Sequence, residues 1–97
     1  MAVMRDVFEE HEVRKIIDAA TTRYRRLEDA YEGLKWRLSH EPQNGVLIPG
    51  YSSPRFLYKI DPPNEELPII LALYEFDGNR ATILSLRLID KPKKKTT

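Results

Sequence analysis

The stretch Ile70–Ile89, "ILALYEFDGNRATILSLRLI", decides the fold because it contains two β-strands joined by a tight turn. Apolar and β-branched residues dominate both halves, and Asp77-Gly78-Asn79 between them is typical of a hairpin turn. A two-residue loop at Gly78-Asn79 pairs Asp77 with Arg80. The pairs that follow are all apolar: Leu73 with Leu84, Leu71 with Leu86, and Ile69 with Leu88.

This register predicts that one face of the hairpin is buried against the rest of the molecule and that the other face is open. The residues expected on the buried face are Leu71, Leu73, Leu84 and Leu86. The residues expected on the opposite face include Ala72, Tyr74, Ser85 and Arg87. A position on the open face would explain why a charged residue, Arg87, occurs in an otherwise apolar strand.

The segment 12–40 has the apolar spacing of amphipathic helices, with apolar or aromatic residues recurring every three or four positions. A single helix of this length, roughly 42 Å, would overhang a domain whose radius of gyration is about 13 Å. We therefore expect two helices, at about 9–21 and 25–40. The break is expected at Thr21-Thr22, because adjacent β-branched residues are poor helix formers.

Two further extended segments lie between the helices and the hairpin. "GVLIPG", residues 45–50, is short, and "RFLYKID", residues 55–61, is a strand candidate that ends at Pro62-Pro63. The sequence thus predicts an α+β fold in which two N-terminal helices pack on a small antiparallel sheet that ends in a β-hairpin. Residues 1–90 are expected to form this single domain, and residues 91–97, "KPKKKTT", a disordered basic tail.

Charge and composition restrict the class of protein. Four of the 16 Lys and Arg residues are in the last seven positions, so residues 1–90 carry 12 basic and 15 acidic side chains, a net charge of −3. Nucleic-acid binders usually have a basic body, so this class is less favoured. The chain has no cysteine and no apolar run long enough for a signal peptide or a membrane span. A cytoplasmic protein without a membrane partner is therefore expected.

Most catalytic and metal-binding signatures are absent from the sequence. The four glycines are scattered and do not form a phosphate-binding loop, and His11 and His40 are far apart, so neither a cofactor nor a metal is expected. Ser52-Ser53 is interpreted as part of a proline-bounded turn. Trp36 is expected to pack on a neighbouring element, with a partner's groove as the alternative.

The candidate binding residues are Arg55, Lys59 and Arg87. If the strand at 55–61 lies beside 69–76, all three share the open face of the sheet. There they form either a clamp for phosphate or long cationic side chains that protect the sheet against edge pairing, and the residues alone leave both alternatives open. A second basic cluster, either a solvated helix end or a partner contact, consists of Arg23, Arg25 and Arg26.

The second helix and the segments after it resemble the RelE/ParE superfamily of toxins from bacterial type II toxin–antitoxin modules. The resemblance covers roughly residues 10–90 and is carried by "LEDAYEGLKWRLSHEPQNGVLIPG", "RFLYKID" and "ALYEFDGNRATILSLRLI". The shared features are a leucine-bearing helix ending in L…P…G, an Arg/Tyr-rich strand, a Tyr-Glu-x-Asp strand entering a tight turn, and a final strand that ends in arginine. The fold implied is a helical hairpin against a twisted antiparallel sheet.

The resemblance implies a toxin-module protein that an antitoxin neutralises. RelE-like toxins cut messenger RNA in the ribosomal A site, and ParE-like toxins poison DNA gyrase. In an mRNA endonuclease, Arg55, Lys59 and Arg87 would hold the scissile phosphate and stabilise the pentavalent state formed when the 2′-hydroxyl attacks. Tyr74, if on the same face, would stack a base or donate a proton.

Three features depart from the family pattern. "MAVMRDVF" offers only a weak strand where the family has its first strand, "KPKKKTT" replaces a C-terminal helix that often supplies an active-site tyrosine, and the body is acidic. No convincing general base is present. The alternative is therefore a non-catalytic member of the fold, either of the gyrase-inhibitor type or a protein-interaction domain. The sequence leaves the target, the antitoxin and the oligomeric state open.

Overall fold

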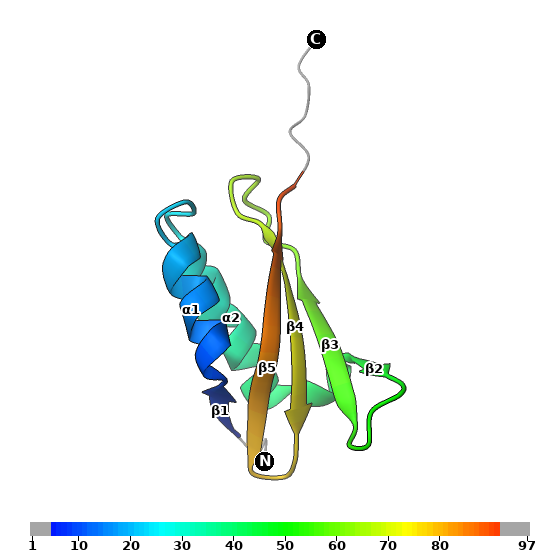
Figure 1. Ribbon diagram of the computed structural model, residues 1–97. Helices are drawn as coiled ribbons and strands as arrows, with labels where there is room; N and C mark the ends of the chain where they lie inside the picture. Colours follow the sequence, from blue (N-terminus) through cyan, green and yellow to red (C-terminus); the bar gives the residue numbers. More distant parts are fainter. Residues whose placement is uncertain (1–4, 92–97) are drawn as a thin grey trace.

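The fold has two layers, with two helices on one side of a five-stranded sheet (Figure 1). The structure is a computed structural model that describes residues 5–91. The helices are α1 (His11–Ala20) and α2 (Leu27–His40), and a 3-10 turn follows at Pro42–Asn44. The strands are β1 (Asp6–Glu9), β2 (Val46–Ile48), β3 (Arg55–Ile60), β4 (Ile69–Phe76) and β5 (Arg80–Ile89), in the spatial order β1-β5-β4-β3-β2. The predicted α+β class and the presence of two helices are confirmed.

Strand β1 corrects the predicted order of elements. It precedes the helices, in the segment that offered only a weak strand, and pairs in parallel with β5, with Val7 opposite Ala81 and Phe8 opposite Thr82. The sheet is therefore mixed, not purely antiparallel. With only 4 residues, β1 is too short to show a clear alternation in the sequence, and its pairing with β5 supplies the missing stabilisation.

The break between the helices lies where the threonines predicted it. The hydroxyl groups of Thr21 and Thr22 donate hydrogen bonds to the carbonyl oxygens of Asp18 and Ala19, at 2.8 and 3.0 Å. These carbonyls belong to the last turn of α1 and have no partner further along the helix. The threonine side chains thus supply hydrogen-bond donors to the last carbonyl groups of α1, and α2 begins at Leu27.

The β4–β5 hairpin has the predicted turn but contains a bulge. The N–H of Asp77 donates to the carbonyl of Arg80 at 2.9 Å, as expected for a two-residue loop. The register then shifts: Tyr74 pairs with Ile83, whereas Leu73 pairs with Ser85, which leaves Leu84 without a partner in the ladder. The predicted apolar pairs beyond this point are therefore wrong.

The bulge and the packing of β4 reverse part of the predicted burial. Ile70, Ala72 and Tyr74 are fully buried on the helix side, so Leu71 and Leu73 face away from the helices. On β5, Leu86 is buried and Arg87 is exposed, as predicted. Both faces of β4 are apolar, so alternation in the sequence could not identify the face that the helices cover. The predicted buried positions of Leu71, Leu73 and Leu84 and the predicted open position of Ala72 are wrong.

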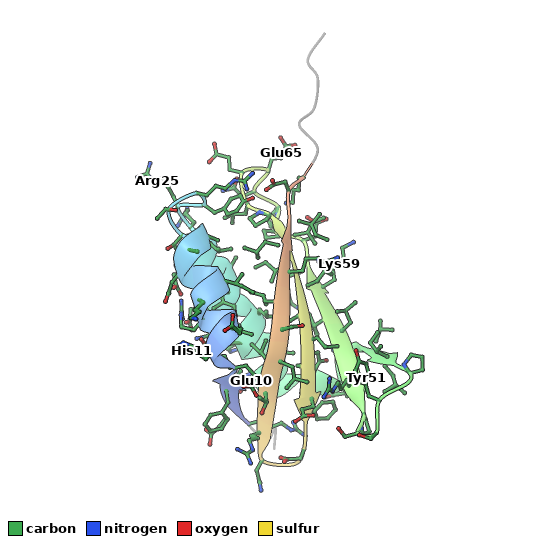
Figure 2. The ribbon with its side chains drawn as sticks, viewed as in Figure 1. Glu10, His11, Arg25, Tyr51, Lys59 and Glu65 are labelled. Carbon is green, nitrogen blue, oxygen red and sulfur yellow. The ribbon has the colours of Figure 1, made fainter. Side chains whose placement is uncertain are left out.

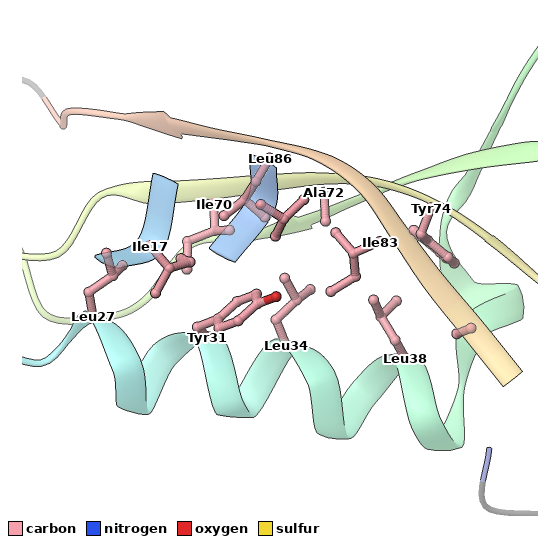
Figure 3. Close-up of a cluster of buried hydrophobic side chains, with 12 residues drawn as sticks. Ile17, Leu27, Tyr31, Leu34, Leu38, Ile70, Ala72, Tyr74, Ile83 and Leu86 are labelled. Atoms are coloured by element: carbon pink, nitrogen blue, oxygen red, sulfur yellow. The ribbon is translucent and has the colours of Figure 1, made fainter. Parts of the chain in front are cut away.

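The core lies between the two layers (Figure 3). The helices contribute one apolar stripe each, at the three- and four-residue spacing that the sequence predicted. The fully buried helix residues are Val13, Ile17, Leu27, Tyr31, Leu34 and Leu38, and they meet Ile70, Ala72, Tyr74, Ala81 and Ile83 of the sheet.

Tyr74 packs at one end of this core, and its hydroxyl donates a hydrogen bond to the carbonyl of Pro42 (Figure 3). Gly45 lies so close that a Cβ atom added there would be 2.1 Å from the Tyr74 Oη atom. The backbone of Gly45 has an ordinary extended conformation, with φ −73° and ψ 166°. The glycine is therefore required by the approach of the tyrosine ring and not by its own dihedral angles.

Candidate functional site

The candidate functional site is the sheet surface opposite the helices. We call it the open face, and it is the side of β3, β4 and β5 that α1 and α2 do not cover (Figure 1). The open face comprises Arg55, Leu57 and Lys59 of β3, Ile69, Leu71, Leu73 and Glu75 of β4, and Thr82, Ser85, Arg87 and Ile89 of β5.

Cationic and leucine side chains alternate on the open face. Lys59 pairs with Leu71, and Leu71 pairs with Arg87, so the two cations flank one leucine in a row across three strands. Figure 2 shows Lys59 extending from β3 away from the helices. The neighbouring row contains Leu57 and Leu73, which are partly exposed. An apolar strip therefore runs between side chains that carry positive charge.

Arg55 lies at the other end of β3 and has a different environment. Its guanidinium carbon is 4.4 Å from the centre of the Tyr51 ring, a cation–π distance. Within residues 5–91, its Nε atom is buried without a hydrogen-bond partner. The Tyr51 side chain comes from the β2–β3 loop and is exposed beside the lower part of β3 (Figure 2). Tyr51 was not identified from the sequence, because nothing there brings this loop residue onto the strand.

A polar hollow of about 470 Å³ adjoins the same end of the open face. Its lining includes Glu10, Ser53, Glu75, Asp77, Arg80 and Thr82. The Asp77 carboxylate accepts hydrogen bonds from the backbone N–H groups of Asn79 and Arg80, at 2.8 and 2.9 Å. These bonds hold the pKa of Asp77 below its ordinary value. Asp77 thus serves the turn, whereas Glu75 points from β4 on the side of Arg55.

The predicted binding residues share a face but do not form one compact clamp. Lys59 and Arg87 occupy a single row, as described above. Arg55 is four residues from Lys59 along β3, about 13 Å in an extended strand. Arg55 is therefore set apart from the row that contains Lys59 and Arg87.

The prediction that Tyr74 shares a face with Arg87 is wrong. Tyr74 is fully buried on the helix side, and its hydroxyl donates to the carbonyl of Pro42. Burial raises the pKa of Tyr74 to about 12. A neutral phenol beneath the helices can neither stack a base nor reach a substrate on the open face.

The second basic cluster contains one arginine in an ion pair and one that is exposed. Arg23 pairs with Asp90 at 2.5 Å and lies over the Tyr24 ring, whereas Arg25 is exposed at the tip of the helical hairpin (Figure 2).

Trp36 does not pack on a neighbouring element as expected: it is 58% exposed and stacks on His40 of its own helix, with ring centres 4.1 Å apart.

Lys91 was predicted as the first residue of a disordered tail, but it contacts the body. Its ammonium nitrogen is 3.0 Å from an Asp61 carboxylate oxygen, and it donates to the carbonyl of Pro62. The side chain is only 15% exposed. Residues 92–97 of the predicted tail lie outside the described part of the chain.

Glu75 is the carboxylate that sequence reasoning missed. It follows Tyr74, the partner of Phe56, so it lies level with Arg55 on the open face, and it lines the hollow. The signal was the charged position between Tyr74 and Phe76 in an otherwise apolar strand. It was not used because the assumed register placed the wrong side of β4 against the helices.

These features define a two-layer α+β domain with an uncovered sheet surface that combines leucines with cations. Comparisons with models of protein families, with curated proteins and with solved structures gave no match. Within residues 5–91, no group of three or more His, Cys, Asp or Glu side chains is arranged to hold a metal ion. The helices of this described region lack the length and apolarity needed to cross a membrane.

Proposed function

We propose that this chain is a RelE/ParE-like toxin-module protein that acts by binding a protein target through its open face. The observation that carries the proposal is the row in which Lys59 and Arg87 flank Leu71 on an uncovered sheet. Cations interleaved with partly exposed leucines suit a protein surface, because burial of the leucines supplies affinity and the charges supply orientation. An antitoxin and a cellular target such as DNA gyrase are the partners that the resemblance implies.

The fold supports this proposal in its arrangement of helices and sheet. A helical hairpin covers one side of the sheet, which is the arrangement that the resemblance implies. Strand β1 precedes the helices, in the segment where the sequence offered only a weak strand.

Induced expression in bacteria tests the proposal, with growth, labelled translation and labelled DNA synthesis followed together. We expect growth arrest from the wild-type chain and loss of arrest from Arg87→Ala, with thermal unfolding unchanged because an exposed charge contributes little to stability. Arg87→Lys should restore arrest only in part if the contact requires a planar guanidinium. Arg25→Ala, an exposed arginine on the helical hairpin, is the matched control and should behave as wild type.

Messenger RNA cleavage is the second candidate function, and what favours it is that Glu75 and Arg55 share the open face, each next to a member of the Phe56–Tyr74 pair. A carboxylate at the hollow would accept the proton of the attacking 2′-hydroxyl while the guanidinium stabilises the pentavalent phosphorus. The bond from phosphorus to the 5′-oxygen then breaks, and that oxygen takes a proton from solvent. Under this mechanism Glu75→Gln abolishes growth arrest. In cells that express the wild-type chain, translation stops before DNA synthesis does. Under the protein-binding mechanism Glu75→Gln retains arrest.

A further inference from the structure

We propose that the edge strand β2 is a self-association surface, through which two copies of this chain pair in antiparallel fashion about a two-fold axis at Leu47. The pairing joins two five-stranded sheets into one continuous sheet. This surface is separate from the row that contains Lys59 and Arg87, so the inference goes beyond the proposed function and does not rest on it.

Strand β2 is an unpaired edge of the sheet (Figure 1). It ends the strand order β1-β5-β4-β3-β2, and among residues 5–91 only β3 pairs with it. An edge strand directs part of its backbone N–H and C=O groups away from the sheet, where they have no partner in the ladder. These groups can pair with a strand of another chain.

The segment that contains β2 is exposed and yet has no charge. Residues 42–54 include no Asp, Glu, Lys or Arg, although the 97-residue chain has 16 basic and 15 acidic side chains. Val46 and Leu47 are 67% and 57% exposed. Tyr51 is exposed in the loop that follows β2 (Figure 2). A surface that is poor in charge and rich in aliphatic and tyrosine side chains is typical of the centre of a protein interface.

The opposite edge of the sheet is protected against pairing. Strand β1 has only 4 residues, and two of them, Asp6 and Glu9, are carboxylates at its two ends. Charged side chains on an edge strand discourage edge-to-edge association. The three residues of β2, Val46–Ile48, have no such protection. One edge is thus closed to another strand and the other is open.

A second copy of this chain is the occupant that the β2 edge favours. Residues near a two-fold axis meet the same residues of the other copy, so any charge there would face a like charge. A partner of different sequence could complement a charged edge and would not require an uncharged one. The antiparallel register centred on Leu47 pairs it with its own counterpart, and pairs Val46 with Ile48 of the second copy. Every cross-strand pair is therefore apolar.

Two features limit the association to a dimer. Pro49 follows β2 directly and has no N–H to donate, so the ladder ends at Ile48. Both outer edges of the joined sheet are then β1 strands, which carry charge, so the sheet does not grow into a fibre.

The size of the surface indicates a weak dimer. A standard interface uses roughly 20–30 residues from each partner, whereas residues 42–54 supply 13. We therefore expect a Kd of roughly 1–100 μM. The net charge of +1 per chain opposes association only slightly.

The dimer would present two binding surfaces in one direction. The two-fold axis of an antiparallel strand pair is perpendicular to the sheet, so the open faces of both copies lie on the same side. Strand β4 and its counterpart are five inter-strand spacings apart, about 24 Å. A target that contacts the Lys59–Arg87 row of both copies would gain affinity from their linkage.

The test is sedimentation equilibrium of the full chain over a concentration series of roughly 1 μM to 1 mM. We expect the average mass to rise from that of one chain to that of two. Leu47→Lys should raise the Kd about tenfold or more, because two ammonium groups then meet at the axis. Phe8→Lys is the matched control, because Phe8 is 49% exposed on the other edge strand, β1, and its replacement should leave the Kd unchanged. Circular dichroism establishes that each variant retains the fold.

Mixing of charged variants tests the register. Leu47→Glu should also be monomeric by itself, whereas an equimolar mixture of the Leu47→Lys and Leu47→Glu chains should form a heterodimer, because opposite charges then face each other. Leu47→Cys introduces a single thiol into a chain that has no cysteine. Mild oxidation should join two such chains by a disulfide, because directly opposed side chains are close enough, and Phe8→Cys should be joined far less.

Four results would overturn the inference. These are a chain that remains monomeric throughout the series, a dimer that Leu47→Lys leaves intact, oppositely charged variants that fail to associate on mixing, and association that continues beyond two chains. Growth arrest and its dependence on Arg87 are measured separately, so each of these results rejects the dimer and leaves the proposed function untouched.

Discussion

The contact between Gly45 and Tyr74 gives the sharpest stability prediction. A Cβ atom at position 45 would be 2.1 Å from Tyr74 Oη, 2.9 Å from Tyr74 Cζ and 3.1 Å from the Leu57 carbonyl oxygen. Gly→Ala in a compatible backbone normally stabilises by about 0.4–1 kcal/mol. Here the overlap with a fully buried ring should dominate, so we expect Gly45→Ala to destabilise by about 1–3 kcal/mol or more. Urea unfolding followed by circular dichroism measures the change.

A double-mutant cycle isolates this contact from other effects. Tyr74→Phe alone should cost about 1–3 kcal/mol, because it leaves the carbonyl of Pro42 without its hydroxyl donor. It also removes the closest atom from the path of the new methyl group. Gly45→Ala should therefore cost at least about 1 kcal/mol less in the Tyr74→Phe background. Additive costs would refute the reasoning.

Gly33 provides the matched control for this cycle. It lies within α2, and a Cβ atom added there meets no atom of the described residues within 4 Å. Gly33→Ala should stabilise the protein by about 0.5–1 kcal/mol, since alanine is the better helix former and no overlap opposes it. The two glycine substitutions should thus have opposite signs in the same unfolding assay.

Three further changes test the packing and the charges. Ile83→Ala should destabilise by about 2–5 kcal/mol, whereas Leu84→Ala should cost clearly less in the same urea assay, because only Ile83 is fully buried in the core. The raised pKa of Tyr74, about 12 against 10.0, means that the folded state holds the phenolic proton more tightly. The protonated phenol therefore contributes fully to the free energy of unfolding below pH 10, and this contribution is lost as the pH rises to about 12. The free energy of unfolding should fall over this pH range, and it should fall less in Tyr74→Phe. Lys91→Ala should lower the melting temperature by removing contacts with Asp61 and Pro62, at a cost of about 1 kcal/mol, and an unchanged value would contradict the role assigned to Lys91.

Much of the fold could be predicted because the helices and the turn carry strong local signals. Apolar residues in 12–40 recur at helical spacing, and Thr21-Thr22 marks the break. Asp77-Gly78-Asn79 specifies the turn through its own chemistry. Strand β1 is different, because its stability comes from a partner strand distant in sequence and its 4 residues show little pattern.

The candidate site was predicted only in part, because some of its residues are placed by local pattern and others by contacts distant in sequence. Arg55 and Lys59 were assigned to the open face because Phe56, Tyr58 and Ile60, which alternate with them along the strand, suit the core. Tyr74 was misplaced because tyrosine is stable on either face when its hydroxyl has an acceptor, and the carbonyl of Pro42 is visible only in three dimensions. Local sequence thus determines which residues avoid the core, and long-range contacts determine which amphipathic residues enter it.

The bulge at Leu84 links the hairpin error to the position of the site. In a regular strand, side chains alternate, so Ile83 on the helix side would place Ser85 and Arg87 on that side as well. An unpaired Leu84 shifts the alternation by one, which allows Ile83 and Leu86 both to enter the core. The same shift moves Arg87 to the open face, opposite Leu71 and in line with Lys59. One extra residue therefore both completes the core and creates the cationic row on which the proposed binding depends.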